Sequence, residues 1–136
     1  MTQASIIVVP GWRDSGPGHW QSLWAERLPN AVRVVQDDWI SPTRKAWVAA
    51  LERTILAAPG PVVVAARSGG YRATLPWLAD ERLEGILLLD GLYRGEERLR
   101  AWLEAPSGAP ARRLVLVSDE TRDRAEALAA ATPGAV

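Results

Sequence analysis

The chain has 136 residues, 48% of them hydrophobic, which is enough for one domain of ordinary size with a substantial apolar core. Lys+Arg and Asp+Glu each number 16, so the formal net charge is zero, without the basic excess that nucleic-acid binding requires. The sequence has no cysteine, which excludes disulfides, thiolate metal sites and a cysteine nucleophile.

Short apolar runs alternate with helical patterns along the N-terminal half. In chain order they predict a strand over 5–9, a helix over 19–28, a strand over 31–36 and a helix that Ser41 caps, Pro42 opens and Pro59 follows. The inward face of the first helix is predicted to carry Trp20, Leu23, Trp24 and Leu28.

The C-terminal half continues the alternation. It predicts a strand over 62–66, a helix over 69–79 that Pro76 kinks or ends early, a strand over 85–89, a helix over 95–104, a loop over 106–110, a strand over 114–117 and a helix over 121–131. We find no internal repeat, linker or second boundary, so residues 1–136 are expected to form a single domain.

Five strands that alternate with helices predict an α/β fold with a parallel sheet covered on both faces. Because crossovers are right-handed, few doubly wound orders remain, and we expect the three-layer αβα order 2-1-3-4-5. Ligands of such sheets bind beyond the carboxyl ends of the strands, near the switch between the first and third strands. The loops 10–19 and 66–71 both emerge there.

Ser68 lies between the apolar run 61–65 and a predicted helix, in the pattern Ala66-Arg67-Ser68-Gly69-Gly70. A serine at a sharp strand-to-helix turn with glycines behind it is typical of a nucleophile elbow. The bland alternative, an N-cap serine after a parallel strand, stays open.

The glycine-rich loop after the first strand lacks the G-K-[ST] ending of a P-loop and the third glycine of a dinucleotide-binding turn. Trp12 in this loop is the best candidate among the seven tryptophans for lining a cleft, whereas Trp47 is expected in the core. His19 is the one histidine of the sequence and is more readily structural than catalytic. With no second histidine or any cysteine, no metal or other cofactor is expected.

Acidic residues follow the later strands. Asp90 closes the predicted fourth strand, and Asp119 and Asp123 follow the fifth. A carboxylate in such a place could orient a catalytic histidine, but it could equally cap the next helix.

Several motifs together resemble the small α/β-hydrolases related to retinoblastoma-binding protein 9. They are Val8-Val9-Pro10-Gly11-Trp12, Ser15-Gly16-Pro17-Gly18-His19-Trp20-Gln21 with Trp24, Asp38-Trp39, Pro42, Trp47 and Pro59-Gly60-Pro61-Val62-Val63. The resemblance implies an α/β-hydrolase fold, a Ser-Asp-His triad and esterase-like serine hydrolase chemistry. It implies Ser68 as the nucleophile and the backbone N–H groups of Trp12 and Gly69 as the oxyanion hole.

The sequence departs from that family at three points. Arg67 stands where the family has a histidine before its nucleophile, and only Asp119 roughly matches the triad acid. The family's triad histidine follows a sixth strand, and we expect this chain to lack both, which would also leave the fifth strand as a sheet edge. The resemblance therefore implies an incomplete or weakly active hydrolase, or a pseudoenzyme.

Two further hypotheses stay open. One is a non-catalytic domain that binds a small anion or a protein partner through the glycine loop, the helix start after Ser68 and Arg67. The other is that the loop folds over the elbow so that His19 serves Ser68 as a base. In either case we expect His19, Arg67 and Tyr71 to line the cleft.

The expected substrate is a small ester or acyl compound, with no nucleic-acid or membrane partner. Residues 1–10 lack the basic start of a signal peptide, and no apolar run approaches the ~20 residues that span a bilayer. A cytoplasmic location is therefore expected.

Overall fold

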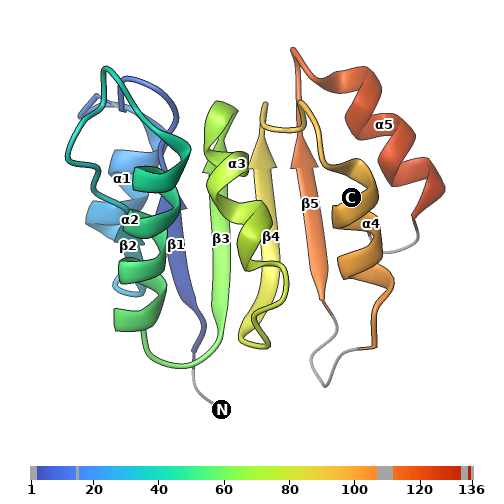
Figure 1. The fold of residues 1–136 in the computed structure, drawn as a ribbon, viewed down its shortest axis with the longest axis horizontal. Helices are drawn as coiled ribbons and strands as arrows, with labels where there is room; N and C mark the ends of the chain where they lie inside the picture. The colour runs from blue at the N-terminus through green and yellow to red at the C-terminus, as the bar shows by residue number, and fades with distance from the viewer. Residues whose placement is uncertain (1–2, 15, 107–111, 133–134, 136) are drawn as a thin grey trace.

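The computed structural model describes residues 3–14, 16–106, 112–132 and 135, and it contains a five-stranded sheet in the order β2-β1-β3-β4-β5 (Figure 1). All neighbouring strands pair in parallel. The strands are β1 (Ser5–Val9), β2 (Ala31–Arg33), β3 (Val62–Arg67), β4 (Leu83–Leu89) and β5 (Arg113–Val117). The predicted α/β class and strand order are confirmed.

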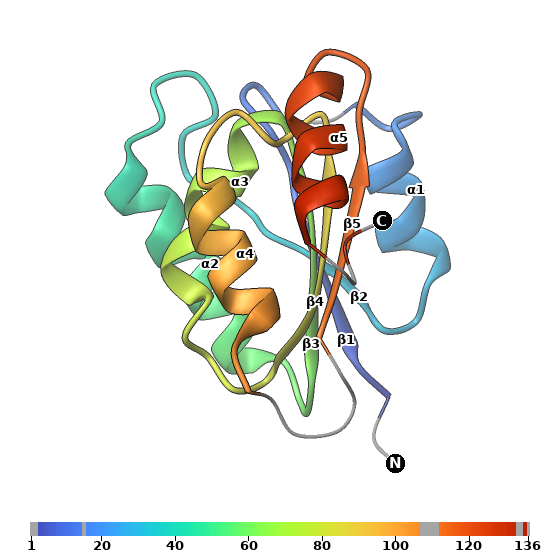
Figure 2. The ribbon, with the colours of Figure 1, turned by 90° about the vertical axis from the view of Figure 1, so that its right-hand side faces the viewer.

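The helices lie on both sides of this sheet. They are α1 (Trp20–Arg27), α2 (Arg44–Ala57), α3 (Tyr71–Thr74), α4 (Glu96–Glu104) and α5 (Arg122–Ala131), with single 3₁₀ turns at Ser68–Gly70 and Leu75–Trp77. Figure 2 shows α2, α3 and α4 on one face and α1 on the other. This placement follows from right-handed crossovers, because the chain moves one way from β1 to β2 and the opposite way afterwards.

The main core lies between the sheet and the layer of α2, α3 and α4. Ile7 of β1, Val64 of β3 and Ile86 of β4 are at most 1% exposed. Leu51 of α2 and Leu99 of α4, from the helical layer, belong to the same hydrophobic core. The apolar runs of the central strands are therefore buried as expected for a parallel sheet with helices packed on it.

Helices lie on both faces of the sheet as expected, but the cover over the second face is thin at β5. In β5, Leu114 is fully buried, whereas Val115 and Val117 are 37% and 52% exposed. Successive strand residues point to opposite faces, so one face of β5 packs on the core and the other is open among the described residues. At the outer edge of β5, Ala135 forms a parallel bridge with Leu114.

One helix start needed correction, and one helix is interrupted as predicted. The second helix begins at Arg44 with Thr43 as its N-cap, because Thr43 Oγ1 accepts a hydrogen bond of 3.1 Å from the backbone N–H of Ala46. Ser41 and Pro42 precede this cap, in a turn that Asp38 holds. The helix predicted over 69–79 is broken into 3₁₀ and α turns, as Pro76 led us to expect.

The inward face of α1 is polar rather than the predicted aromatic stripe. Its buried residues are Gln21 and Ser22, whereas Trp20 and Trp24 are half-buried and contact each other edge to face. Gln21 Nε2 donates to the carbonyl of Val9 at 2.9 Å, so the helix is bonded to the end of β1 instead of resting on it through large side chains.

None of the described helices has the length and apolar character needed to cross a bilayer. Most of the loop predicted over 106–110 lies outside the described residues.

Candidate active site

Ser68 stands at the carboxyl end of β3, where the chain turns into the 3₁₀ turn that leads to α3. Its φ is +49°, in the left-handed region that non-glycine residues seldom occupy. Arg67 before it is extended and Gly70 after it is right-handed helical, so the reversal is concentrated at this one residue. A serine held in this strained conformation is the geometry of a nucleophile elbow.

Glycines let neighbouring segments approach the elbow closely. A Cβ atom at Gly11 would lie 3.2 Å from Ser68 Cβ, and one at Gly70 would lie 3.0 Å from the carbonyl oxygen of Val9. A Cβ at Gly91 would lie 3.5 Å from the carbonyl oxygen of Ser68. Larger side chains at Gly11 and Gly70 would push the first loop and the elbow apart, so the site depends on backbone contact.

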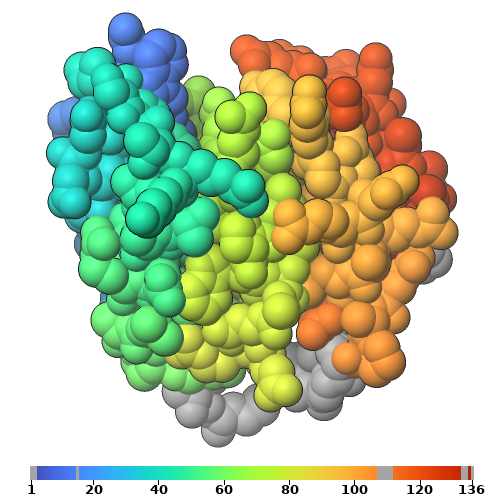
Figure 3. Space-filling view, in the orientation of Figure 1, coloured from blue at the N-terminus to red at the C-terminus, as the bar shows by residue number. Residues whose placement is uncertain are grey.

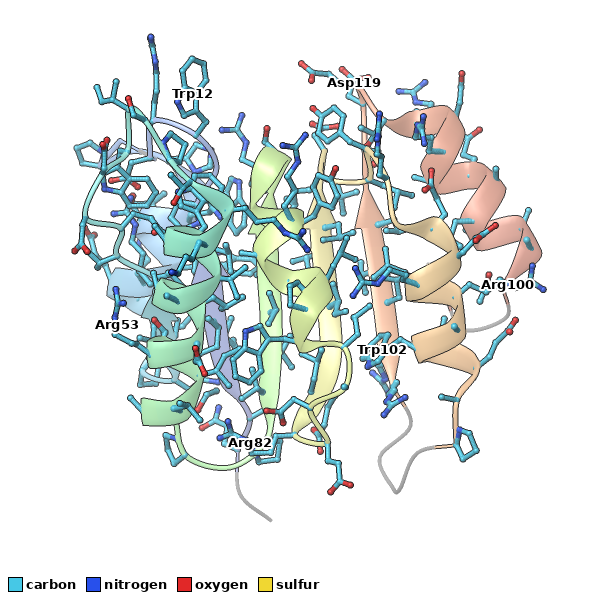
Figure 4. The ribbon with its side chains drawn as sticks, in the orientation of Figure 1. Trp12, Arg53, Arg82, Arg100, Trp102 and Asp119 are labelled. Atoms are coloured by element: carbon cyan, nitrogen blue, oxygen red, sulfur yellow. The ribbon has the colours of Figure 1, made fainter. Side chains whose placement is uncertain are left out.

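The loop that carries Trp12 is fixed beside the elbow by the segment that precedes α2. Trp12 Nε1–H donates to the carbonyl of Ile40 at 3.1 Å, and the N–H of Arg13 donates to the carbonyl of Trp39 at 3.2 Å. The Trp12 ring is 57% exposed, with the Arg13 guanidinium carbon 4.5 Å from its centroid. Figure 4 shows Trp12 at the edge where the carboxyl ends of the strands meet.

A pocket of about 320 Å³ opens beside Ser68, which is within the usual size range of small-molecule sites. Its walls come from the Trp12 loop, the start of α2, the residue after Ser68 and α3, and include Trp12, Arg44, Trp47, Gly69 and Arg72. Figure 3 shows the surface hollowed between the N-terminal segments and the C-terminal ones at this edge. The pocket therefore adjoins the candidate oxyanion donors at Trp12 and Gly69.

Tyr93, which the sequence analysis did not single out, lies on the other side of Ser68. Its hydroxyl donates to Glu120 Oε2 at 3.1 Å, and its ring centroid is 6.1 Å from that of Tyr71. Burial and the hydrogen bond to Glu120 raise the pKa of Tyr93, against the opposing effect of the Ser68 side chain. Tyr93 is therefore a neutral phenol near Ser68.

Asp90 holds the loops after β4 and β5 together. Its φ is +45°, and its Oδ1 accepts backbone N–H groups of Asp119 at 2.6 Å and Glu120 at 3.0 Å. These bonds bring Glu120 within reach of Tyr93. The sequence placed Asp90 directly after the fourth strand. It did not predict that Asp90 accepts hydrogen bonds from the loop after β5.

Asp119, the candidate triad acid, lies at the tip of the loop after β5 (Figure 4). Its side chain is 87% exposed, and its Oδ1 forms an ion pair of 3.2 Å with Arg122. Asp123 lines a separate groove between α4 and α5.

His19 is the N-cap of α1: its Nδ1 accepts the backbone N–H of Gln21 at 3.3 Å. Burial lowers the pKa of His19 from its usual 6.5, and the positive charges of Arg67 and Arg33 lower it further. Among the described residues no hydrogen bond joins His19 to Ser68. The imidazole is thus a neutral cap in this structure.

The other two residues expected at the cleft differ in exposure. Arg67 is exposed beside Ser68, whereas Tyr71 is only 3% exposed and begins α3. Within the described part of the chain no group of three His, Cys, Asp or Glu side chains could hold a metal ion.

Comparison with known proteins gives one family and two similar structures. The sequence model of the serine hydrolase family matches residues 6–125. A protein described as a YdeN-like hydrolase from Pectobacterium atrosepticum is 25% identical, with 90% of this chain and 70% of that chain covered and a TM-score of 0.67. The ydeN gene product from B. subtilis is 18% identical, with 98% and 85% covered and a TM-score of 0.63, which shows the shared fold. No curated protein matches the chain.

The strain at Ser68 predicts an unusual order of stability for its variants. We expect Ser68→Gly to be more stable than Ser68→Ala by about 1 kcal/mol, because glycine adopts positive φ without the penalty of a Cβ atom. At Ser41, whose φ is not positive, alanine should be at least as stable as glycine. Urea unfolding of Ser68→Gly, Ser68→Ala, Ser41→Gly and Ser41→Ala measures which variant of each pair is more stable. Equal stability of the two variants at position 68 would contradict the strained elbow.

The lowered pKa of His19 predicts a pH dependence of stability. The unfolded chain protonates His19 at a higher pH than the folded chain, so unfolding takes up a proton and stability falls as pH drops below the usual value of 6.5. Asn at this position can cap the helix without titrating. We therefore expect His19→Asn to lose less stability than the wild type between about pH 7.5 and 5.5 in urea unfolding. Parallel losses would show that His19 titrates alike in both states.

Proposed function

The chain belongs to the serine hydrolase family, and from that membership we propose that it is an esterase-like α/β-hydrolase domain with Ser68 as its nucleophile. We further propose that it is related to the small α/β-hydrolases of the retinoblastoma-binding protein 9 type. The observation that carries the proposal is the φ of +49° at Ser68, at the end of β3 and beside a pocket.

The proposed reaction is acyl transfer to water. Ser68 Oγ bonds to the carbonyl carbon of a small ester, the ester C–O bond breaks, and the alcohol leaves with the hydroxyl proton. Water then attacks the acyl-serine and restores the hydroxyl, so each turnover consumes one ester and one water and yields one acid and one alcohol. The backbone N–H groups of Trp12 and Gly69 are the proposed donors to the oxyanion. The contact of Gly11 with Ser68 supports this role for the adjacent Trp12.

We propose that residues 1–136 alone turn over slowly, because their one histidine caps α1 and no hydrogen bond between described residues joins its imidazole to Ser68. Serine hydrolases that have lost a triad member keep only about 10³–10⁴-fold acceleration over water. In this proposal Asp119 is an incomplete triad acid, which its exposure and its pairing with Arg122 favour over a working one.

A non-catalytic role is the second candidate. The chain would then use the pocket beside Ser68 to bind a small anion or a segment of a partner protein. The capping role of His19 and the exposed Arg67 favour this alternative. Rapid hydrolysis of small acyl esters would exclude it.

Covalent labelling tests the nucleophile directly. We expect a fluorophosphonate probe to label the wild type slowly, at one site, and to leave Ser68→Ala unlabelled, because the proposed oxyanion donors act on the probe even where no imidazole base activates the hydroxyl. Ser118→Ala removes a hydroxyl that bonds Thr121 and serves as the control, with labelling unchanged. Absence of labelling in the folded wild type, or equal labelling of Ser68→Ala, would contradict the proposal.

The phenol beside the nucleophile gives a second test. We expect Tyr93→Phe to slow labelling about tenfold, the size of one hydrogen bond, because the Tyr93 hydroxyl lies close enough to Ser68 for the Ser68 side chain to affect its pKa. Glu120→Gln should have a smaller effect because an amide oxygen still accepts from Tyr93, and Glu126→Gln on exposed α5 surface should have none. Wild-type labelling kinetics in folded Tyr93→Phe would show that Tyr93 does not position Ser68.

A further inference from the structure

Two arginines line the pocket, and two more belong to the neighbouring segments that carry Trp12 and Ser68. Arg44 and Arg72 line it, Arg13 stands over the Trp12 ring, and Arg67 is exposed next to Ser68. None of these four takes part in an ion pair with a described residue. The described ion pairs use other arginines, namely Arg33, Arg82, Arg100, Arg122 and Arg124.

No carboxylate is among the residues that line this pocket. Asp38, in the neighbouring turn, accepts the N–H groups of Ile40 and Ser41 at 2.8 and 2.9 Å. The carboxylates nearest Tyr93 belong to Asp90 and Glu120, on the opposite side of Ser68. Although the chain has zero net charge, its charges are separated around Ser68. Arginines lie toward the pocket, and carboxylates lie toward Tyr93.

The walls between Ser68 and the two lining arginines are largely apolar. Trp12 and Trp47 contribute aromatic surface, and Trp47 Cζ3 would be 3.9 Å from a Cβ at Gly69. Arg44 comes from the first residue of α2 and Arg72 from the second residue of α3, so the cations stand on two different elements. A ligand that fits this arrangement has an apolar stem and an anionic end.

We propose that this pocket receives the acyl part of the substrate and selects an acyl group that ends in a carboxylate. The inference rests on the proposed function in taking Ser68 as the point of attack. The ester carbonyl then lies at Ser68 and Gly69, the stem runs along Trp12 and Trp47, and the free carboxylate meets Arg44 and Arg72. The planar guanidinium fork suits a carboxylate because it donates two parallel hydrogen bonds. The substrate class is thus a monoester of a dicarboxylic acid.

The test compares two probes that differ by one methyl group and one charge, monomethyl adipate and dimethyl adipate. Both are titrated into Ser68→Ala, which cannot react, while NMR follows the backbone N–H of Gly69 and the indole N–H of Trp12. We expect the monoester to bind at least about fivefold more tightly at low salt, in keeping with two exposed ion pairs, and the advantage to shrink in high salt.

Matched variants in the same Ser68→Ala background locate the charge effect. Arg44→Gln with Arg72→Gln keeps most of both side-chain stems and should bring the two probes to within about twofold. Arg53→Gln on the same helix is the control and should keep the full preference, since Arg53 projects from the outer side of α2 away from Trp12 (Figure 4). Equal binding of the probes, binding of neither, or a preference that survives the double variant would overturn the inference.

A final arm separates this inference from the proposed function. In the wild type, monomethyl adipate should slow fluorophosphonate labelling of Ser68 more than dimethyl adipate does at the same concentration. If the wild type is not labelled at all, the proposed nucleophile fails, while the titrations of Ser68→Ala still decide whether the pocket selects a carboxylate. If labelling occurs but the two probes protect Ser68 equally, the carboxylate pocket fails and the nucleophile stands.

Discussion

The left-handed backbone of Ser68 is the constraint around which this edge of the molecule is organised. A serine with positive φ is stable only if its surroundings hold it there, and the holding is done by close backbone contacts at Gly11, Gly70 and Gly91. These contacts place the Trp12 loop on one side of the hydroxyl and the loops after β4 and β5 on the other. The same small residues that permit the strain therefore also assemble the site.

Hydrogen bonds from side chains to the backbone hold the flanking loops. The side chain of Gln21 donates a hydrogen bond to the end of β1. The carboxylate of Asp38 accepts two N–H groups in the turn before α2, and that of Asp90 accepts two in the loop after β5. Such bonds to buried or turn backbone groups fix geometry more firmly than exposed ion pairs do. One consequence is the hydrogen bond between Tyr93 and Glu120, which holds a neutral phenol near Ser68.

Charge is distributed unevenly around a serine that lies in a neutral chain. Arg44 and Arg72, which form no ion pair with a described residue, line the pocket with Trp12, whereas the carboxylates of Asp90 and Glu120 lie near Tyr93. The net charge of zero could not reveal this polarity, because opposite charges cancel in the sum. In the proposed function, this polarity would give the two ends of a bound ester different environments.

The sequence by itself determined the fold class, the strand order and the place of the elbow. Those features follow from local signals: apolar runs of strand length, helical spacing, and glycines directly after Ser68. The partners of Ser68 could not be read in the same way, since Glu120 follows Tyr93 by 27 residues and the two meet only because β4 and β5 are neighbours. The polar inward face of α1 and the open face of β5 also escaped prediction, because a residue's burial depends on what packs over it and not on its own hydrophobicity. Only the tertiary structure decided which loops meet around the serine, because such contacts join segments that are remote in the chain.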